Sequence, residues 1–326
     1  MNLKPAFSKD ILKINDIEST VNMICTNLKN DIQNILRRKG GIIGISGGID
    51  SSVTLALAVK ALGADKIKGL MLPEKDSSPE SLVLAKKLAD KFQVQYEIEE
   101  ISGALQGLNC YGRRDEAVKK VFPEYDSKNY KFKIGITPNP LSPNLPAIFN
   151  ATIIDSQGGQ KSKILPLTEY LQIVAASNFK QRTRMSMIYY YAEKMHYAVI
   201  GTPNKHEVEQ GFFVKYGDGG ADIMPIAHLF KTQVYQIAHY LEIPQEIIDR
   251  TPTTDTYSAE QTQEEFFFQL PFYQMDLLWY AFENNYSAEE VGEVLGMTEK
   301  EVQGIFNGFV RKIKTTDYLR MTPIKY

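Results

Sequence analysis

A short apolar run between glycines, Gly41 to Ile45, constrains the fold more than any other segment of this chain. Such a run is typical of a strand that is buried on both faces, as in a parallel sheet. Residues 68–73 and 95–98 predict two further strands, and residues 52–60 and 81–92 predict the helices between them. Strands that alternate with helices are joined by right-handed crossovers. We therefore expect an α/β fold, a doubly wound parallel sheet flanked by helices.

Residues 102–165 are expected to form a β-rich insertion. Four prolines between positions 137 and 146 exclude a helix or a central strand there. The alternating residues 131–134 and the apolar run 148–154 predict strands, and Gly158-Gly159 predicts the turn of a hairpin. The insertion could be a surface decoration, or it could form a lid or a dimer contact.

Helical periodicity dominates the remaining segments. Apolar residues recur every three or four positions between 17 and 36 and again between 171 and 195, which predicts two amphipathic helices. One more buried strand is expected at residues 198–200. Residues 255–326 are expected to form a helical C-terminal part, so that residues 1–326 make a single domain.

Composition excludes several classes of protein. Apolar residues make up 43% and charged residues 23% of the chain, as in soluble globular domains. The net charge of −2 provides no basic field for nucleic acid, and no apolar run approaches the roughly 18–20 residues that span a bilayer, so neither partner is expected. Cys25 and Cys110 cannot make a disulfide framework, and residues 1–16 lack the pattern of a signal peptide, so a cytoplasmic location is expected.

The loop Ser46-Gly47-Gly48-Ile49-Asp50-Ser51-Ser52 stands between the first predicted strand and its helix. Ligands of open α/β sheets bind at the carboxyl ends of the strands. Two glycines let the backbone approach an anion, and backbone N–H groups, three serine hydroxyls and a helix N-terminus would bind phosphates there. A carboxylate beside phosphates becomes favourable when Mg²⁺ lies between them, which suits Asp50. The alternative is a helix-capping turn, which requires fewer of these residues.

Residues 46–51 resemble the signature of the PP-loop ATP pyrophosphatases. The resemblance implies an adenine nucleotide alpha hydrolase-like fold and cleavage of ATP between its α and β phosphates, with adenylation of a carboxyl or carbonyl oxygen. The loop lacks both GxGxxG and the lysine of GxxxxGK[ST], so a dinucleotide dehydrogenase and a P-loop NTPase are not indicated.

Three further segments resemble those of the NAD synthetase family. Residues 178–185 match Asn-x-x-Ala-Arg-x-Arg-Met with Gln181 in place of the alanine, residues 201–207 match Gly-Thr-x-Asn-Lys-x-Glu, and residues 211–225 match Gly-Phe-Phe-Thr-Lys-Tyr-Gly-Asp-Gly-Gly-x-Asp-Ile-x-Pro almost throughout. The resemblance covers about residues 20–320 without the insertion. Only about 40 residues precede the first strand, too few for a glutaminase domain, so the ammonia-dependent branch is expected.

The resemblance implies a ligase that forms a carbon–nitrogen bond. Its expected reaction is the ATP-dependent amidation of deamido-NAD (nicotinate adenine dinucleotide) to NAD with ammonia, through an acyl-adenylate and with release of AMP and pyrophosphate. Mg²⁺ is the implied cofactor, ATP the cosubstrate and a homodimer the implied assembly.

The resemblance also assigns roles to individual residues. Asp50 and Lys231 are the expected catalytic residues, and Arg182, Lys215 and Asp222 the expected contacts of the dinucleotide. Asp50 and Glu207 are the expected metal ligands, since each follows the end of a strand at one edge of the sheet. The expected ATP contacts are Gly44, Ser46, Gly47, Gly48, Asp50, Ser51, Ser52, Thr202, Lys231 and Thr253.

Two departures leave alternatives open. Asp317-Tyr318-Leu319-Arg320 replaces a polar Glu-His-Lys-Arg-like run that contacts the substrate in ammonia-dependent relatives, so nicotinate mononucleotide or another carboxylate is an alternative substrate. Residues 287–302 resemble a helix-turn-helix, which makes a nucleotide-sensing DNA-binding regulator a remote alternative. Five glutamates and one lysine between positions 287 and 303 disfavour DNA binding. A tRNA-modifying enzyme is disfavoured because the chain has no basic domain and no CxxC pair.

Apolar residues near both ends of the chain could build the surface of a C2 homodimer. The alternative for the same residues is the core of the subunit. The residues concerned are Val21, Ile24, Leu28, Phe266, Phe267, Phe268, Phe272, Tyr273 and Trp279.

Overall fold

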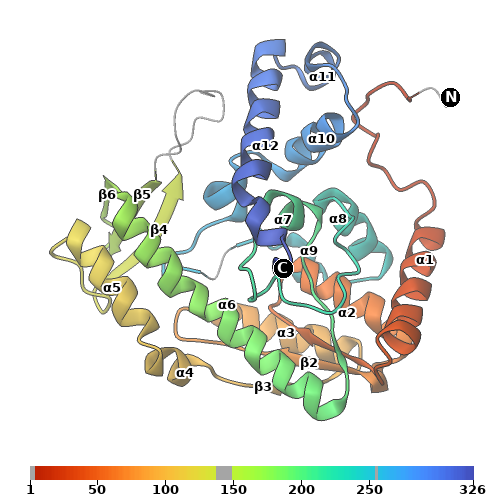
Figure 1. Ribbon diagram of the computed structural model, residues 1–326, viewed down its shortest axis with the longest axis horizontal. Helices are drawn as coiled ribbons and strands as arrows, with labels where there is room; N and C mark the ends of the chain where they lie inside the picture. The colour runs from red at the N-terminus through yellow and green to blue at the C-terminus, as the bar shows by residue number, and fades with distance from the viewer. Residues whose placement is uncertain (1–3, 137–148, 254–255) are drawn as a thin grey trace.

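A four-stranded parallel sheet organises the computed structural model, which describes residues 4–136, 149–253 and 256–326 (Figure 1). The strand order is β3 (Gln95–Ile98), β2 (Ile67–Met71), β1 (Gly41–Gly44), β7 (Ala198–Val199). A parallel bridge between Ile200 and Ile223 continues the sheet beyond β7. From β1 the chain proceeds to β2 on one side and later to β7 on the other, so the switch point of the topology lies beside β1.

Helices cover both faces of this sheet, as the apolar strands predict. Ile43 packs with α1 (Ile17–Asn30), α2 (Ile49–Leu62), α3 (Pro79–Lys91) and α8 (Lys231–Tyr240) on one face. Its neighbour Ile42 packs with α6 (Leu167–Met195) on the other face. Both isoleucines are fully buried, because successive side chains of a strand point to opposite faces. The doubly wound fold is confirmed. The short helices η1 (Asp31–Ile35) and η2 (Ala64–Lys66) complete these connections.

The insertion is partly helical and partly β. Strands β4 (Tyr130–Ile136), β5 (Phe149–Asp155) and β6 (Gln160–Ile164) form an antiparallel sheet. The Asp155 carboxylate accepts hydrogen bonds from the backbone of Gln157 and Gly159, which closes the predicted hairpin. The proline-rich stretch 137–146 lies outside the described residues.

The β expectation is wrong for the first part of the insertion. Residues 102–121 form α4 (Ser102–Gly107) and α5 (Cys110–Val121) instead. Leu105, Cys110 and Tyr111 from these helices are buried against the same face of the main sheet as Ile42. Burial of that apolar surface outweighs the weak local pattern of the segment.

The C-terminal part is helical, as expected. It consists of η3 (Glu264–Phe268), α10 (Phe272–Glu283), α11 (Ala288–Leu295) and α12 (Glu299–Arg320), and the short helices α7 (Lys205–Gln210) and α9 (Gln245–Asp249) precede it. An aromatic-rich cluster around Trp279 holds α10, α11 and α12 together. Ser287 and Thr298 cap α11 and α12 by accepting backbone hydrogen bonds. The helix-turn-helix-like segment is therefore a packed helix pair.

The apolar residues considered for a dimer surface lie mostly inside the subunit. Val21, Ile24 and Leu28 are at most 5% exposed and pack in the core around α2. Phe268, Phe272 and Trp279 are buried in the C-terminal cluster, Phe266 and Phe267 are half-buried, and Tyr273 is exposed. Core packing therefore accounts for most of this set.

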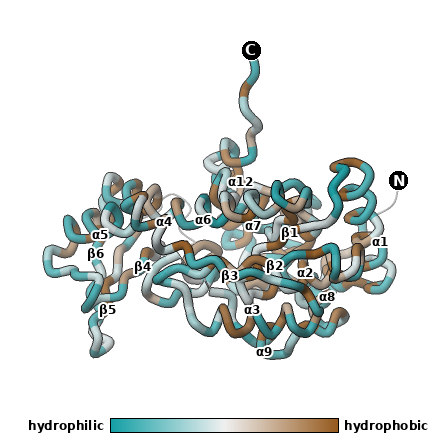
Figure 2. The backbone as a smooth tube through the Cα atoms, turned by 90° about the horizontal axis from the view of Figure 1, so that it is seen from below, coloured by the Kyte–Doolittle hydropathy of each residue, from teal (hydrophilic) through white to brown (hydrophobic). Residues whose placement is uncertain are grey.

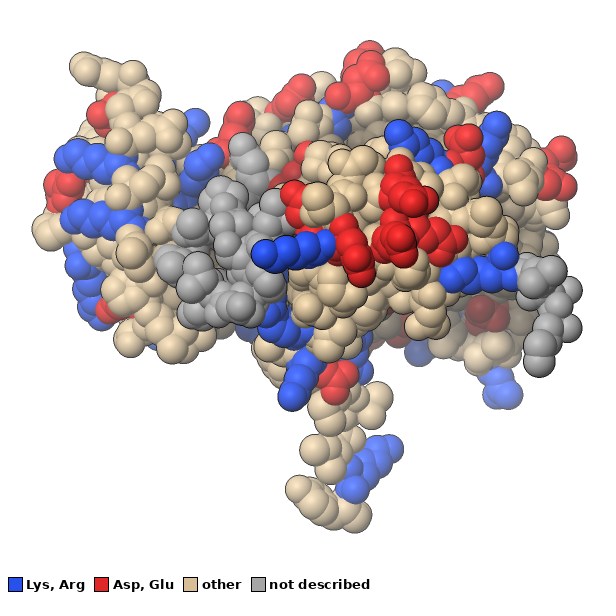
Figure 3. All heavy atoms as spheres, turned by 90° about the horizontal axis from the view of Figure 1, so that it is seen from above, with Lys and Arg blue, Asp and Glu red and all other residues tan. Residues whose placement is uncertain are grey.

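The surface carries charges of both signs. On the face drawn in Figure 3, acidic side chains gather near the middle of the main body, and basic side chains lie around them and on the lobe at the left. Residues 321–326 follow α12 as an exposed segment that projects from the body (Figure 2). Within the described ranges, no helix combines the length and the apolar character that crossing a membrane requires.

Candidate active site

The loop after β1 is shaped before any ligand binds. Gly47 has a φ of +75°, and a Cβ at this position would lie 2.5 Å from the backbone oxygen of Ser81, so only glycine fits here. The hydroxyls of Ser51 and Ser52 donate to the backbone oxygen of Gly48, at 3.0 and 2.8 Å. Ser46 Oγ accepts from the N–H of Gly48 and lies 3.2 Å from Ser51 Oγ. The loop and the first turn of α2 thus form one ordered unit.

Asp50, in the first turn of α2, faces a buried lysine from α8. Its Oδ2 lies 2.5 Å from Lys231 Nζ, and Lys231 is fully buried. Burial by itself would lower the pKa of Lys231, but attraction to Asp50 and Glu207 outweighs it and raises this pKa. The lysine therefore stays protonated next to the loop.

Asn204 brings a second carboxylate to the same place. Its side chain donates to Asp50 Oδ1 at 3.3 Å and caps α7 by accepting from the N–H of Glu207. Glu207 Oε2 in turn accepts from the N–H of Asn204 at 2.9 Å. Burial, and then repulsion from Asp50, raise the pKa of Glu207 to about 8. A buried carboxylate whose pKa is raised by a neighbouring carboxylate marks a place where a cation is favoured.

The donor set fits magnesium bound together with a nucleotide. Over the described ranges, no cluster of three or more His, Cys, Asp or Glu side chains could hold a metal by protein ligands alone. Mg²⁺ does not need such a cluster, because it is usually bound by one or two carboxylates together with substrate phosphates and water. Asp50 and Glu207 beside the loop match that requirement.

The remaining predicted ATP contacts lie on neighbouring segments. Gly44 is the last residue of β1, and Thr202 lies between β7 and α7 and is half-buried. Thr253 pairs with Thr262 in an isolated bridge. Arg250, three residues earlier, donates to Ser81 Oγ at 3.0 Å, and the backbone of Ser81 is the one that approaches Gly47. The segment of Thr253 is thus linked to the loop through α3.

The predicted dinucleotide contacts fall into two groups. Arg182 donates to the backbone oxygen of Lys215 at 3.3 Å, and Lys215 Nζ donates to the backbone oxygens of Tyr318 and Met321 at 2.7 and 2.9 Å. Asp222 shares no hydrogen bond with Arg182 or Lys215 among those that the structure gives for the described residues. Its carboxylate accepts from the N–H of Val199 in β7 and from the hydroxyl of Tyr189.

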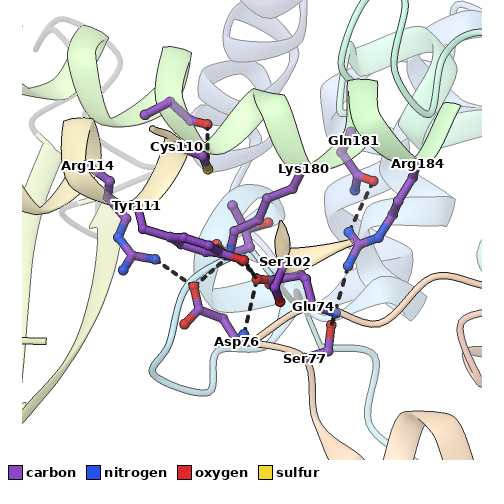
Figure 4. A network of polar contacts seen from close by, with 12 residues as sticks. Glu74, Asp76, Ser77, Ser102, Cys110, Tyr111, Arg114, Lys180, Gln181 and Arg184 are labelled. Carbon is purple, nitrogen blue, oxygen red and sulfur yellow. Dashed lines mark hydrogen bonds and ion pairs between the residues drawn. The ribbon is translucent and has the colours of Figure 1, made fainter. Parts of the chain in front are cut away.

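A buried ionic network at the carboxyl end of β2 was not predicted from the sequence (Figure 4). Lys180 Nζ lies 2.9 Å from Glu74 and 2.8 Å from Asp76, and Arg114 lies 2.6 Å from Asp76. The hydroxyl of Tyr111 donates to Glu74 at 2.7 Å. Burial would raise the pKa of Asp76, but Lys180 and Arg114 outweigh it and lower this pKa. The network ties the loop after β2 to α5 and α6.

One sequence signal could have revealed this network. Glu74 and Asp76 follow the proline that ends a predicted strand, so they stand after the carboxyl end of β2 as Asp50 stands after that of β1. Arg184 supports the same loop, because its guanidinium donates to the backbone oxygen of Leu72 and to Ser77 Oγ. The cations come from distant segments, and no local pattern pairs them with these acids.

The doubly wound sheet and the phosphate-binding type of loop at its switch point define an α/β nucleotide-binding protein. The sequence model of the family described as NAD synthase matches residues 20–129 and 152–323. The chain belongs to the NAD synthase family.

Several curated relatives are similar over nearly the whole chain. The NH(3)-dependent NAD(+) synthetase of Rhizobium rhizogenes strain K84 is 44% identical over 324 residues, which cover 99% of this chain and 97% of the relative. The enzyme of the same name from Rhizobium meliloti strain 1021 is also 44% identical, with the same coverage.

Solved structures show the same fold at low sequence identity. The NMN synthetase from Francisella tularensis superposes with a TM-score of 0.61 at 21% identity, over 96% of this chain and 99% of the other. The NH3-dependent NAD synthetase from Campylobacter jejuni has a TM-score of 0.61 at 20% identity, over 95% and 99%.

Proposed function

We propose that this chain is an ammonia-dependent NAD synthase that amidates deamido-NAD. One observation carries the proposal: Asp50, Glu207 and Lys231 converge at a phosphate-binding type of loop. The chain also shares 44% identity over 99% of its length with relatives named NH(3)-dependent NAD(+) synthetase. The family uses ATP as a cosubstrate, and small molecules are its substrates.

The first proposed step is adenylation of the acid. A nicotinate carboxylate oxygen forms a bond to the α-phosphorus of ATP, and the bond from that phosphorus to the β-phosphate oxygen breaks. The N–H groups of the loop and the hydroxyls of Ser46, Ser51 and Ser52 bind the departing pyrophosphate. Lys231 offsets the charge that develops there. Asp50 and Glu207 would hold a Mg²⁺ ion, which would supply positive charge to the same phosphates.

The second proposed step forms the amide. Ammonia attacks the carbonyl carbon of the acyl-adenylate, the bond from that carbon to the phosphate oxygen breaks, and AMP leaves while a proton goes to solvent. This chemistry needs no side-chain nucleophile, so catalysis consists of positioning and charge stabilisation.

The dinucleotide is proposed to contact Arg182, Lys215 and Asp222. Arg182 and Lys215 are already joined through the Lys215 backbone, and the end of α12 holds the Lys215 ammonium. Hydrogen bonds to backbone oxygens leave that charge uncompensated and available to an anionic substrate. Thr202 and Thr253 complete the proposed ATP site. We further propose a homodimer and a cytoplasmic location.

Nicotinate mononucleotide is the second candidate substrate. It is favoured by the segment of Tyr318 and Leu319, which stands where ammonia-dependent relatives place a polar substrate contact. The shorter substrate lacks the adenylate half that such a contact would recognise.

An AMP-release assay tests the proposal. Purified protein would receive ATP, Mg²⁺ and ammonium together with deamido-NAD, nicotinate mononucleotide or nicotinate. We expect AMP release with deamido-NAD at the highest kcat/KM, and its loss in Asp50→Asn and Glu207→Gln. A higher kcat/KM for the mononucleotide would make it the substrate in place of deamido-NAD. Release of ADP instead of AMP would refute the proposed adenylation step.

A further inference from the structure

A buried chain of hydrogen bonds connects α12 to the first turn of α8. Lys312 Nζ donates to Gln210 Oε1 at 3.1 Å, and Gln210 Nε2 lies 3.0 Å from His206 Nδ1. His206 Nε2 lies 2.6 Å from Asp276 Oδ1, and Asp276 Oδ2 accepts from the N–H of Thr232 at 2.7 Å. Gln210, His206 and Asp276 are fully buried.

The chemistry of Lys312 sets the direction of every bond in this chain. Burial lowers the pKa of Lys312 to about 7, so below that pH its side chain is mostly an ammonium, which only donates, and Gln210 must then present its oxygen to Lys312 and its amide nitrogen to His206. Nδ1 of His206 then accepts, which leaves the hydrogen on Nε2, where it is donated to Asp276. The His206 ring packs against Phe230 and Trp279, so bulk water does not compete for these bonds.

The chain of hydrogen bonds ends beside two of the three charged residues that converge at the loop after β1. His206 directly precedes Glu207 at the start of α7, and Thr232 directly follows Lys231 at the start of α8. Asp276, from α10, is bonded to both helix starts at once. Displacement of either helix start would move Glu207 or Lys231 relative to Asp50, and small misplacements of charged groups cost large factors in rate.

We propose that His206 and Asp276 are positioning residues for the nucleotide site, which hold Glu207 and Lys231 in place facing Asp50. The proposal rests on the proposed function. It gives the C-terminal helices α10 and α12 a role in aligning the ATP site, in addition to their packing in the C-terminal hydrophobic cluster.

Asp276→Asn tests the direction of the chain. To keep the bond from Thr232, the new amide must donate to His206 Nε2, which shifts the histidine hydrogen to Nδ1 and turns the Gln210 amide. At pH 6, below the lowered pKa of Lys312, two donors, the Gln210 amide and the Lys312 ammonium, then face each other. We expect affinity for Mg²⁺ with α,β-methylene-ATP to fall about tenfold, as expected for one unsatisfied buried group. The double variant Asp276→Asn with Lys312→Met lacks the second donor. We expect its affinity for the analogue, measured by calorimetry, to be at least threefold higher than that of Asp276→Asn.

A matched control separates this effect from net charge. The double variant Asp276→Asn with Lys205→Met also removes one lysine charge. Lys205 pairs with Glu209 and Glu283 and does not belong to the chain of hydrogen bonds, so no recovery of analogue affinity is expected. Tyr125→Phe removes a buried hydroxyl from the insertion and should leave analogue binding unchanged.

A second pair of variants keeps the test decisive if Asp276→Asn fails to fold. His206→Gln retains one donor and one acceptor and should bind the analogue within about threefold of wild type, whereas His206→Leu should lose about tenfold or more. The positioning role would be overturned if Asp276→Asn or His206→Leu bound the analogue as tightly as wild type. It would also be overturned if Lys312→Met and Lys205→Met restored the analogue affinity of Asp276→Asn equally. Wild type that binds the analogue but releases no AMP with any nicotinate acid would refute the proposed function alone.

Discussion

Lys180→Met should be strongly destabilising because Lys180 is the cation shared by two buried acids. Its ammonium contacts Glu74, Asp76 and the backbone oxygen of Thr256. The side chains of Lys180, Glu74 and Asp76 are 2%, 0% and 5% exposed. Methionine fills a similar volume without the charge, so Glu74 would lose the cation that it contacts, and Arg114 alone would pair with Asp76 and Asp115.

The expected loss follows from the burial of these groups. Removing one partner of a buried ion pair costs about 3–5 kcal/mol, because the other partner stays buried and uncompensated. That loss is a large part of the roughly 5–15 kcal/mol that stabilises a typical domain. Urea unfolding at pH 8, followed by circular dichroism, measures it. Lys87→Met is the control: Lys87 and its partner Glu246 are 50% and 57% exposed, and such pairs are worth about 0–1 kcal/mol.

The pH dependence gives an independent check. The pKa of Asp76 is lowered in the folded protein, so its pairing adds stability above the unfolded pKa of about 3.9 and this stability is lost as pH falls through the lowered pKa. In Lys180→Met the stabilisation from the pairing of Asp76 is largely absent, and Asp76 can take up a proton instead. The difference from wild type should therefore narrow as pH falls towards about 4. The reasoning would be refuted if Lys180→Met lost no more unfolding free energy at pH 8 than Lys87→Met does. It would also be refuted if the difference in unfolding free energy between Lys180→Met and wild type did not depend on pH.

Three further outcomes are expected. Gly47→Ala should weaken binding of α,β-methylene-ATP and lower stability by about 1–2 kcal/mol or more, because alanine is strained at positive φ and its Cβ would meet Ser81; unchanged calorimetry would contradict this. Deletion of residues 321–326 removes one backbone partner of Lys215 but keeps Arg320, which donates to the α7 backbone next to Glu207, so KM for the nicotinate substrate should change with little effect on KM for ATP, as steady-state kinetics can show. At fixed total ammonium, AMP release should rise with pH because only neutral ammonia is a nucleophile, and a flat profile would count against ammonia as the nitrogen donor.

The nucleotide-binding half of the molecule was predictable because its signals are local. A strand buried on both faces needs an apolar run, and a tight phosphate-binding turn needs glycine, so β1 and the loop at Gly47 are visible in a few consecutive residues. The same holds for the alternating strands of the insertion. Neighbouring strand ends share one edge of a sheet, which is why Asp50 and Glu207 could be placed near each other before any coordinates.

Tertiary structure decided the features that depend on partners far away in the chain. The early apolar helix could have faced a second subunit, and packing against α2 places Leu28 in the core instead. No local pattern pairs Lys180 with Asp76, which is 104 residues away, or His206 with Asp276, which is 70 residues away. A sequence shows which residues can be charged, but burial decides whether a charge needs a partner, and only the folded chain determines which partner it has.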